Sequence, residues 1–144
     1  MAAVSHTAGN EFACDLCRTD GGEIVWRDDF CRVVLVGDRD YPAFCRVILN
    51  RHVREMTDLA DAERNRLMRV VFAVEAALRA SLAPEKINLA SLGNQVPHLH
   101  WHVVPRFHND RHFPSPIWAP PTRDSGISPG LTMEHLRELL GALL

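Results

Sequence analysis

The stretch His98-Leu99-His100-Trp101-His102-Val103-Val104 decides the fold of this chain. Its three imidazoles occupy strictly alternate positions, with apolar side chains between and behind them. Because successive side chains of a β-strand point to opposite faces, we expect a strand with the histidines on one face and the apolar residues on the other. The apolar face can then enter a core while the imidazoles face a cleft.

Two other segments have the apolar spacing of amphipathic helices. The first covers about residues 61–82, with Asp61 as a candidate cap and Pro84 just beyond its end. The second follows Thr132, which we expect to cap it. Between the histidine strand and this last helix, five prolines, at 105, 114, 116, 120 and 121, predict an ordered loop over the surface.

Four further apolar segments, at residues 24–26, 31–36, 44–49 and 86–91, predict strands separated by turns. Strands from both halves of the chain thus flank one long helix, and the early connections have the length of hairpins. The regular alternation of strand and helix that a doubly wound fold needs is missing. We therefore predict an α+β domain with a mainly antiparallel sheet.

Composition limits the classes of partner. The 144 residues carry a formal charge of −2, and they show no basic stripe that would follow a nucleic acid polymer, although a small anion needs only a local positive pocket. No apolar run is long enough to span a membrane, and the first nine residues do not resemble a signal peptide. We expect a cytoplasmic protein without a membrane partner, in which the four cysteines are thiols or metal ligands.

The histidine stretch fits the signature His-φ-His-φ-His-φ-φ, where φ is apolar, and so resembles the histidine triad (HIT) superfamily of nucleotide hydrolases and transferases. Residues 42–53 resemble the family segment Pro-Gly-His-x-Leu-Val-x-Pro-x-x-His-Val without gaps. The matching residues are Pro42, Val47, His52 and Val53, and the departures include Ala43, Phe44 and Leu49. The resemblance covers about residues 12–108.

Residues 92–106, with Asp110, Pro116 and Trp118, resemble a bacterial branch commonly called diadenosine-tetraphosphate-hydrolase-like. The resemblance implies a compact HIT-like protomer that pairs into a homodimer, with a shallow purine nucleotide pocket ending at the triad. We expect a disordered N-terminus over residues 1–10 and a single HIT domain over residues 11–144. Its core covers about residues 12–108, and a proline-rich loop and a C-terminal helix cover residues 109–144.

The resemblance also implies a role for each triad histidine. His100, the middle one, attacks the α-phosphate of a (di)nucleoside polyphosphate and forms a nucleotidyl-histidine, which water cleaves to release a nucleoside monophosphate such as AMP. Imidazole suits this role because its ring nitrogen is substantially unprotonated near neutral pH. His102 donates to the phosphate oxygens and His98 supports the nucleophile, without a required cofactor. The alternative is that His100 and His102 are buried, hydrogen-bonded core residues.

The short loop before the histidine strand carries candidate phosphate contacts. Asn94 and Gln95 have amides that can donate to a phosphate or leaving group. Gln95 stands where relatives commonly have Ser or Thr, and it cannot relay a proton as a hydroxyl can. Either Asn88 or Asn94 takes the asparagine position of the family, with turn chemistry as the alternative.

Four other positions each allow two interpretations. Asp38 resembles a residue that binds ribose hydroxyls, but it also suits a turn. Arg106 holds a distal phosphate or is an exposed arginine. Trp118 covers the nucleotide or the dimer partner, or it packs. Phe44 replaces a histidine that many relatives hold near the phosphates, and it packs in the core or contacts the base.

Cys14 and Cys17 have the spacing of half a zinc site. In some HIT relatives, histidines at the positions of His52 and His98 complete a Cys2His2 structural zinc site. The alternative is a pair of thiols near a turn, with His98 hydrogen-bonded instead.

Three functions are therefore compatible with the sequence. The first is the HIT-type hydrolase or transferase that acts through a nucleotidyl-histidine. The second is a metal-dependent hydrolase in which the triad binds a catalytic ion that activates water. The third is a nucleotide-binding protein with little turnover, because Phe44 and Gln95 depart from the family pattern.

Overall fold

The computed structural model of the chain describes residues 11–144, so the expected disorder of residues 1–10 lies outside the described part. Five strands form one sheet in the order β1-β2-β3-β5-β4, and each neighbouring pair is antiparallel. The strands are β1 (Glu23–Arg27), β2 (Cys31–Leu35), β3 (Cys45–Leu49), β4 (Lys86–Ala90) and β5 (His100–Arg106). The α+β fold with an antiparallel sheet, predicted from the sequence, is confirmed.

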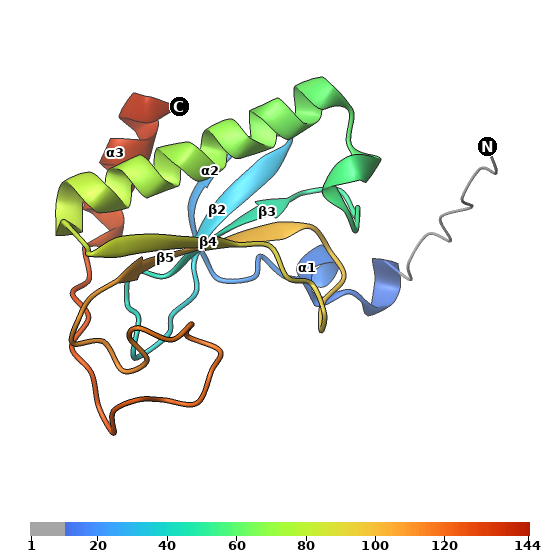
Figure 1. Cartoon of the computed structure of the whole chain (residues 1–144). Helices are drawn as coiled ribbons and strands as arrows, with labels where there is room; N and C mark the ends of the chain where they lie inside the picture. Colours follow the sequence, from blue (N-terminus) through green and yellow to red (C-terminus); the bar gives the residue numbers. More distant parts are fainter. Residues whose placement is uncertain (1–10) are drawn as a thin grey trace.

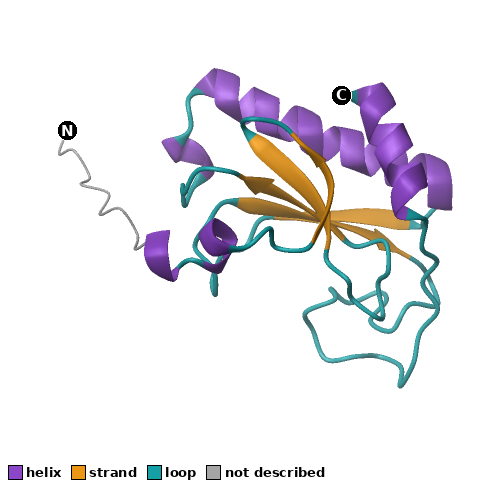
Figure 2. Ribbon diagram, turned by 180° about the vertical axis from the view of Figure 1, so that it is seen from behind, coloured by secondary structure: helices purple, strands orange, loops and turns teal. Residues whose placement is uncertain are grey.

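Two helices cover one face of this sheet. Figures 1 and 2 show α2 (Asp61–Leu82) and α3 (Met133–Leu143) on the same side, with the long loop after β5 on the other. Shorter helices, η1 (Glu11–Ala13), α1 (Asp15–Arg18) and η2 (Met56–Asp58), lie in the connections. None of the helices in residues 11–144 is long and apolar enough to cross a bilayer.

The boundaries of α2 agree with the helical pattern, but its cap does not. Ala60 occupies the N-cap, and Asp61 is the first helical residue. The Glu63 carboxylate accepts a hydrogen bond from the backbone N–H of Ala60, which is the reciprocal bond of a capping box and not the cap expected of Asp61. At the other helix the prediction is confirmed, because Thr132 Oγ1 accepts from the backbone N–H of His135 at 3.1 Å.

The histidine strand differs from its predicted extent at both ends. It begins at His100; the N–H of Leu99 donates to the Val53 carbonyl, outside the ladder, while its carbonyl accepts from Leu49 of β3. It continues to Arg106 and includes Pro105, which was expected to lie in irregular structure. A proline fits there because Val103 is the last residue of β5 that pairs with β3, so no ladder hydrogen bond needs the missing N–H.

The alternation within this stretch is confirmed. Leu99 and Val103 are buried in the main core beneath α2, with Trp101 packed against it. The imidazoles of His98 and His100 point to the opposite side of the sheet, as alternation along the strand requires. The sheet therefore separates the hydrophobic core from the face that carries the histidines.

The proline-rich loop after β5 is fixed by a buried ion pair. The Asp110 carboxylate is fully buried and accepts from Arg106 Nε at 2.8 Å and Nη2 at 3.0 Å. It also accepts from the hydroxyl of Tyr41 and from the backbone N–H groups of Phe107, His112 and Phe113. Burial alone would raise the pKa of Asp110, but these donors hold it well below its usual range.

Candidate functional site

Two hydrogen bonds to backbone carbonyls fix the first two triad rings. His98 Nε2 lies 2.6 Å from the carbonyl oxygen of Leu49, and His100 Nδ1 lies 2.5 Å from the carbonyl oxygen of His98. A carbonyl only accepts, so each of these ring nitrogens carries the proton and donates. In a neutral imidazole the other nitrogen keeps its lone pair. His100 Nε2 is therefore the unprotonated nitrogen of the middle histidine.

Burial keeps the rings of His100 and His102 neutral. It lowers the pKa of His100, an effect opposed by the bond to His98 and reinforced by the charge of Arg46. Burial lowers the pKa of His102 to about 3, with His100 and Arg46 adding to the shift. Both rings are neutral at pH 7, so His102 can donate to a phosphate oxygen through one ring nitrogen but brings no charge of its own.

A pocket of about 280 Å³ opens beside these two rings. It collects residues from α1, β3, β5, the loop before β5 and the proline-rich loop: Leu16, Arg46, Leu92, Gly93, Asn94, Gln95, Val96, His100, His102 and Trp118. Five of the residues predicted from sequence therefore meet at one site. The pocket combines an apolar part with amide and imidazole donors, as ligand pockets for small molecules commonly do.

Aromatic side chains hold His102 in place. Its ring centroid lies 5.5 Å from that of Phe44 and 4.9 Å from that of Trp118. Phe44 is buried, so of its two interpretations the structure favours packing. Trp118 is 48% exposed, packs on His102 and lines the pocket, so its packing interpretation is supported and contact with a nucleotide stays a prediction.

Three residues predicted to contact the nucleotide, Asp38, Asn88 and Arg106, are instead bonded to other parts of the protein. Asp38 Oδ1 accepts from the backbone N–H groups of Asp40 and Tyr41, which is turn chemistry. Arg106, expected either to bind phosphate or to be exposed, is 2% exposed and bonds to Asp110, to the Ser115 carbonyl and to Asn88 Oδ1. Arg106 and Asn88 hold the proline-rich loop against the sheet, Asp38 fixes its own turn, and none of the three predicted residues lines the pocket.

The sequence prediction missed Arg46. This residue lies on β3 directly opposite His102 in the β3–β5 pairing, and its side chain lines the pocket. One signal was present, because Arg46 is the only charged residue in the apolar segment 44–49. Its relation to His102 depends on the register of two strands that are far apart in sequence.

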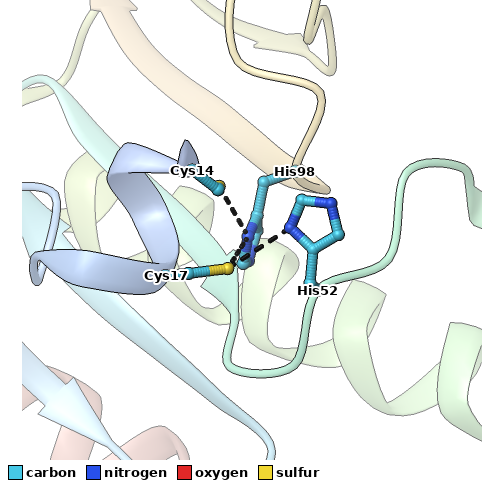
Figure 3. A group of neighbouring side chains, drawn as sticks. All are labelled: Cys14, Cys17, His52 and His98. Carbon is cyan, nitrogen blue, oxygen red and sulfur yellow. Dashed lines mark hydrogen bonds between the residues drawn. The ribbon is translucent and has the colours of Figure 1, made fainter. Parts of the chain in front are cut away.

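A second cluster lies beside the triad. Figure 3 shows Cys14 and Cys17, from the region of α1, facing His52 and His98, and the four potential ligand atoms lie within 4.8 Å of one another. His98 Nδ1 is 3.4 Å from each sulfur, and His52 Nδ1 is 3.3 Å from Cys17 Sγ. Tetrahedral zinc with ordinary bond lengths puts sulfur and nitrogen ligands about 3.5 Å apart. The four residues therefore fit a structural zinc ion.

The surroundings of the cluster agree with this fit. The bond from His98 Nε2 to the Leu49 carbonyl leaves Nδ1 free to face the cysteines, as a second-shell partner does at metal sites. Burial and the neighbouring Cys14 raise the pKa of Cys17 to about 11 without a cation. A cation bound at this cluster would favour the Cys17 thiolate.

The comparisons decide the family. The HIT domain profile matches residues 20–109, which is more than half of the chain. The chain belongs to the HIT domain family. Members of this family are nucleotide-binding hydrolases and transferases, and some are binding proteins only. A search of curated proteins found no match for this HIT protein.

Solved structures of other HIT proteins are similar over most of their length. A histidine triad protein from Marinobacter aquaeolei VT8 is 25% identical with a TM-score of 0.71, covering 87% of this chain and 93% of that one. A histidine triad protein from Sinorhizobium meliloti 1021 is 26% identical with a TM-score of 0.65, covering 86% and 88%. A zinc-bound histidine triad family protein from Mycobacterium smegmatis shares the fold at 22% identity and a TM-score of 0.65, covering 92% and 96%.

Proposed function

We propose that this HIT protein cleaves an α-phosphate ester or anhydride of a (di)nucleoside polyphosphate through a nucleotidyl-histidine on His100. The observation that carries the proposal is the bond from His100 Nδ1 to the His98 carbonyl, which leaves the lone pair on Nε2 of a ring that lines the pocket. A neutral, oriented imidazole beside amide donors is what attack on phosphorus requires.

The proposed reaction has two steps. In the first, the lone pair of His100 Nε2 forms a bond to the α-phosphorus, and the bond to the leaving group breaks with its electron pair. In the second, a water oxygen attacks the same phosphorus and the phosphorus–nitrogen bond breaks, returning the electron pair to His100. The water gives up one proton, and a nucleoside monophosphate is released. His102, Asn94 and Gln95 donate to the phosphate oxygens in both steps.

The apolar part of the pocket supports a purine nucleotide as the ligand. Leu16, Leu92 and Val96 line it together with the Trp118 ring. A purine base is flat and apolar on both faces, so such side chains can enclose it without unpaired polar groups. The proposed setting is the cytoplasm.

We also propose a structural zinc ion bound by Cys14, Cys17, His52 and His98. The sulfur–nitrogen distances of 3.3–3.4 Å support it. When bound, the ion supplies a cross-link between α1, the loop after β3 and the start of the histidine strand. The ion would hold His98 in place, and the carbonyl of His98 orients His100.

A homodimer is proposed as well. Within the described residues β4 forms an edge of the sheet and pairs only with β5, and Phe72 on the neighbouring α2 is 54% exposed. An uncovered edge beside an exposed aromatic side chain suits association with a second copy. Light scattering on the purified protein should give twice the 16.2 kDa mass of one chain, and the mass of a single chain would contradict the dimer.

The test of the proposed function uses His100→Asn. Asparagine keeps a polar group of similar reach but has no nucleophilic ring nitrogen, so release of AMP from adenylylated substrates should fall below detection. A matched control is His108→Asn, because His108 is exposed, contacts Glu85 and Phe113 and lies outside the pocket. Full activity of His100→Asn would contradict covalent catalysis, and binding of AMP without turnover in the wild type would favour the binding-protein alternative.

A catalytic metal on the triad is less consistent with the geometry. His98 presents Nδ1 to the cysteines, and His100 Nδ1 is bonded to a carbonyl. Among residues 11–144, the converging group of potential metal ligands includes His98 but neither His100 nor His102.

A further inference from the structure

Arg46 brings a permanent positive charge into the pocket. Among the described residues that line the pocket, Arg46 is the only lysine or arginine. It lies opposite His102 across the β3–β5 pair, so its charge sits on the same face as the triad.

Among the described residues, no acidic side chain forms an ion pair with the Arg46 guanidinium. Its Nε is buried without a hydrogen-bond partner. Its nearest support is the Phe44 ring, whose centroid lies 5.6 Å below the guanidinium carbon. Burial lowers the pKa of Arg46, and no acidic neighbour opposes the shift. A half-buried cation without a partner is costly unless a ligand supplies the anion.

Phe44 and Arg46 lie together beside His102, on the face of the sheet that carries the triad. Phe44 stands where many HIT proteins carry a histidine, and it contacts both the Arg46 guanidinium and the His102 ring. Phe44, which lies just before β3, thus provides an apolar ring on which the Arg46 guanidinium rests.

The described lining of the pocket lacks an acidic group that could donate a proton to a leaving group. None of its lining residues within the described chain carries a carboxyl or hydroxyl group that could protonate a leaving group. The proton on His100 Nδ1 is donated to the His98 carbonyl rather than to the pocket. Amine and alkoxide leaving groups need a proton as they depart, whereas a phosphate leaves as a stable anion and needs only neutralisation of its charge.

We propose that Arg46 holds an anionic leaving group, so that this pocket selects nucleotides with a phosphoanhydride at the α-phosphate over phosphoramidates with an amine leaving group. This inference rests on the proposed function and specifies its substrate class. In the step concerned, His100 Nε2 bonds to the α-phosphorus, the bridging oxygen keeps the electron pair, and the departing phosphate stays paired with the Arg46 guanidinium through charge-assisted hydrogen bonds.

The kinetic test compares diadenosine tetraphosphate with adenosine 5′-phosphoramidate. Arg46→Gln should lower kcat/KM for the anhydride by about 10- to 100-fold, the usual effect of losing a charge-assisted hydrogen bond, and that for the phosphoramidate by less than about 3-fold. Arg39→Gln is the matched control, because Arg39 is exposed and lies outside the pocket. An equal loss on both substrates, or no loss on the anhydride, overturns the inference.

A binding experiment separates this inference from the proposed function. In a His100→Asn background, calorimetry should show tighter binding of ADP than of AMP, and adding Arg46→Gln should remove that preference. This result can be obtained even if the protein turns over no substrate, in which case the proposed function alone fails. An unchanged preference for ADP overturns the role of Arg46. Arg46→Lys keeps the charge and should retain part of the preference, and it carries the test should Arg46→Gln not fold.

Discussion

The buried pair of Arg106 and Asp110 offers a sharp test of how the site is held in place. The two side chains are 2% and 0% exposed, and the carboxylate accepts hydrogen bonds from the guanidinium, from Tyr41 and from three backbone N–H groups. Asp110→Asn removes the charge and leaves the Arg106 cation buried. Breaking a buried pair from one side costs about 3–5 kcal/mol of unfolding free energy. For a chain of this length that loss corresponds to a fall in Tm of roughly 10–15 °C.

The control is the exposed pair of Arg111 and Asp40, whose side chains are 36% and 37% exposed. Asp40→Asn should cost less than about 1 kcal/mol, because solvent screens the interaction. The assay is urea unfolding of both variants and the wild type at pH 7. If Asp110→Asn is no more destabilising than Asp40→Asn, the structural role given to the buried pair is wrong.

The pH dependence adds a second criterion. The pKa of Asp110 is lowered in the folded protein, so its stabilisation is complete above the unfolded value of 3.8 and is lost as the pH falls through the folded pKa. The difference in stability between wild type and Asp110→Asn should therefore narrow below about pH 4. A difference that stays constant as the pH falls would refute this reasoning.

Three further predictions concern the pocket and the cysteine cluster. Cys17→Ser should lower the metal content from one zinc per chain to none and reduce Tm, while Cys45→Ser, which changes a buried thiol outside the cluster, should leave the metal in place. Trp118→Ala should weaken AMP binding by about 2- to 10-fold, because the ring packs on His102 at 4.9 Å; unchanged affinity would rule out its contact with the nucleotide. His102 has a folded pKa of about 3 against 6.5 when unfolded, so its neutral form stabilises the fold above pH 6.5 and this contribution is lost between pH 6.5 and 3; His102→Gln should flatten the stability curve in that window.

Local patterns were enough to predict the framework of this protein. The alternation of residues 98–104 specified which side chains enter the core, and the apolar spacing of residues 61–82 located α2 at both ends. Both patterns depend on the geometry of a single element, so no knowledge of its neighbours was needed. The same reason explains why Asn94 and Gln95, in the loop leading to the histidines, were assigned to the site.

Contacts between distant segments could not be read in the same way. Arg106 was expected to bind phosphate or face solvent because its partners, Asp110, Asn88 and the Ser115 carbonyl, come together only in the folded chain. Arg46 was missed because the pairing of β3 with β5 brings it opposite His102. The sequence alone does not show whether an arginine is paired with an acidic residue of the protein or is available to bind an anionic ligand.

The most direct test of the account is the mass of the enzyme trapped during turnover. Wild-type protein mixed with a dinucleoside polyphosphate and quenched in alkali, which preserves a phosphorus–nitrogen bond, should gain one nucleotidyl group. Peptide mapping should locate that group on His100, and acid should remove it. Hydrolysis that proceeds without any adduct, or an adduct that persists in His100→Asn, would contradict the account.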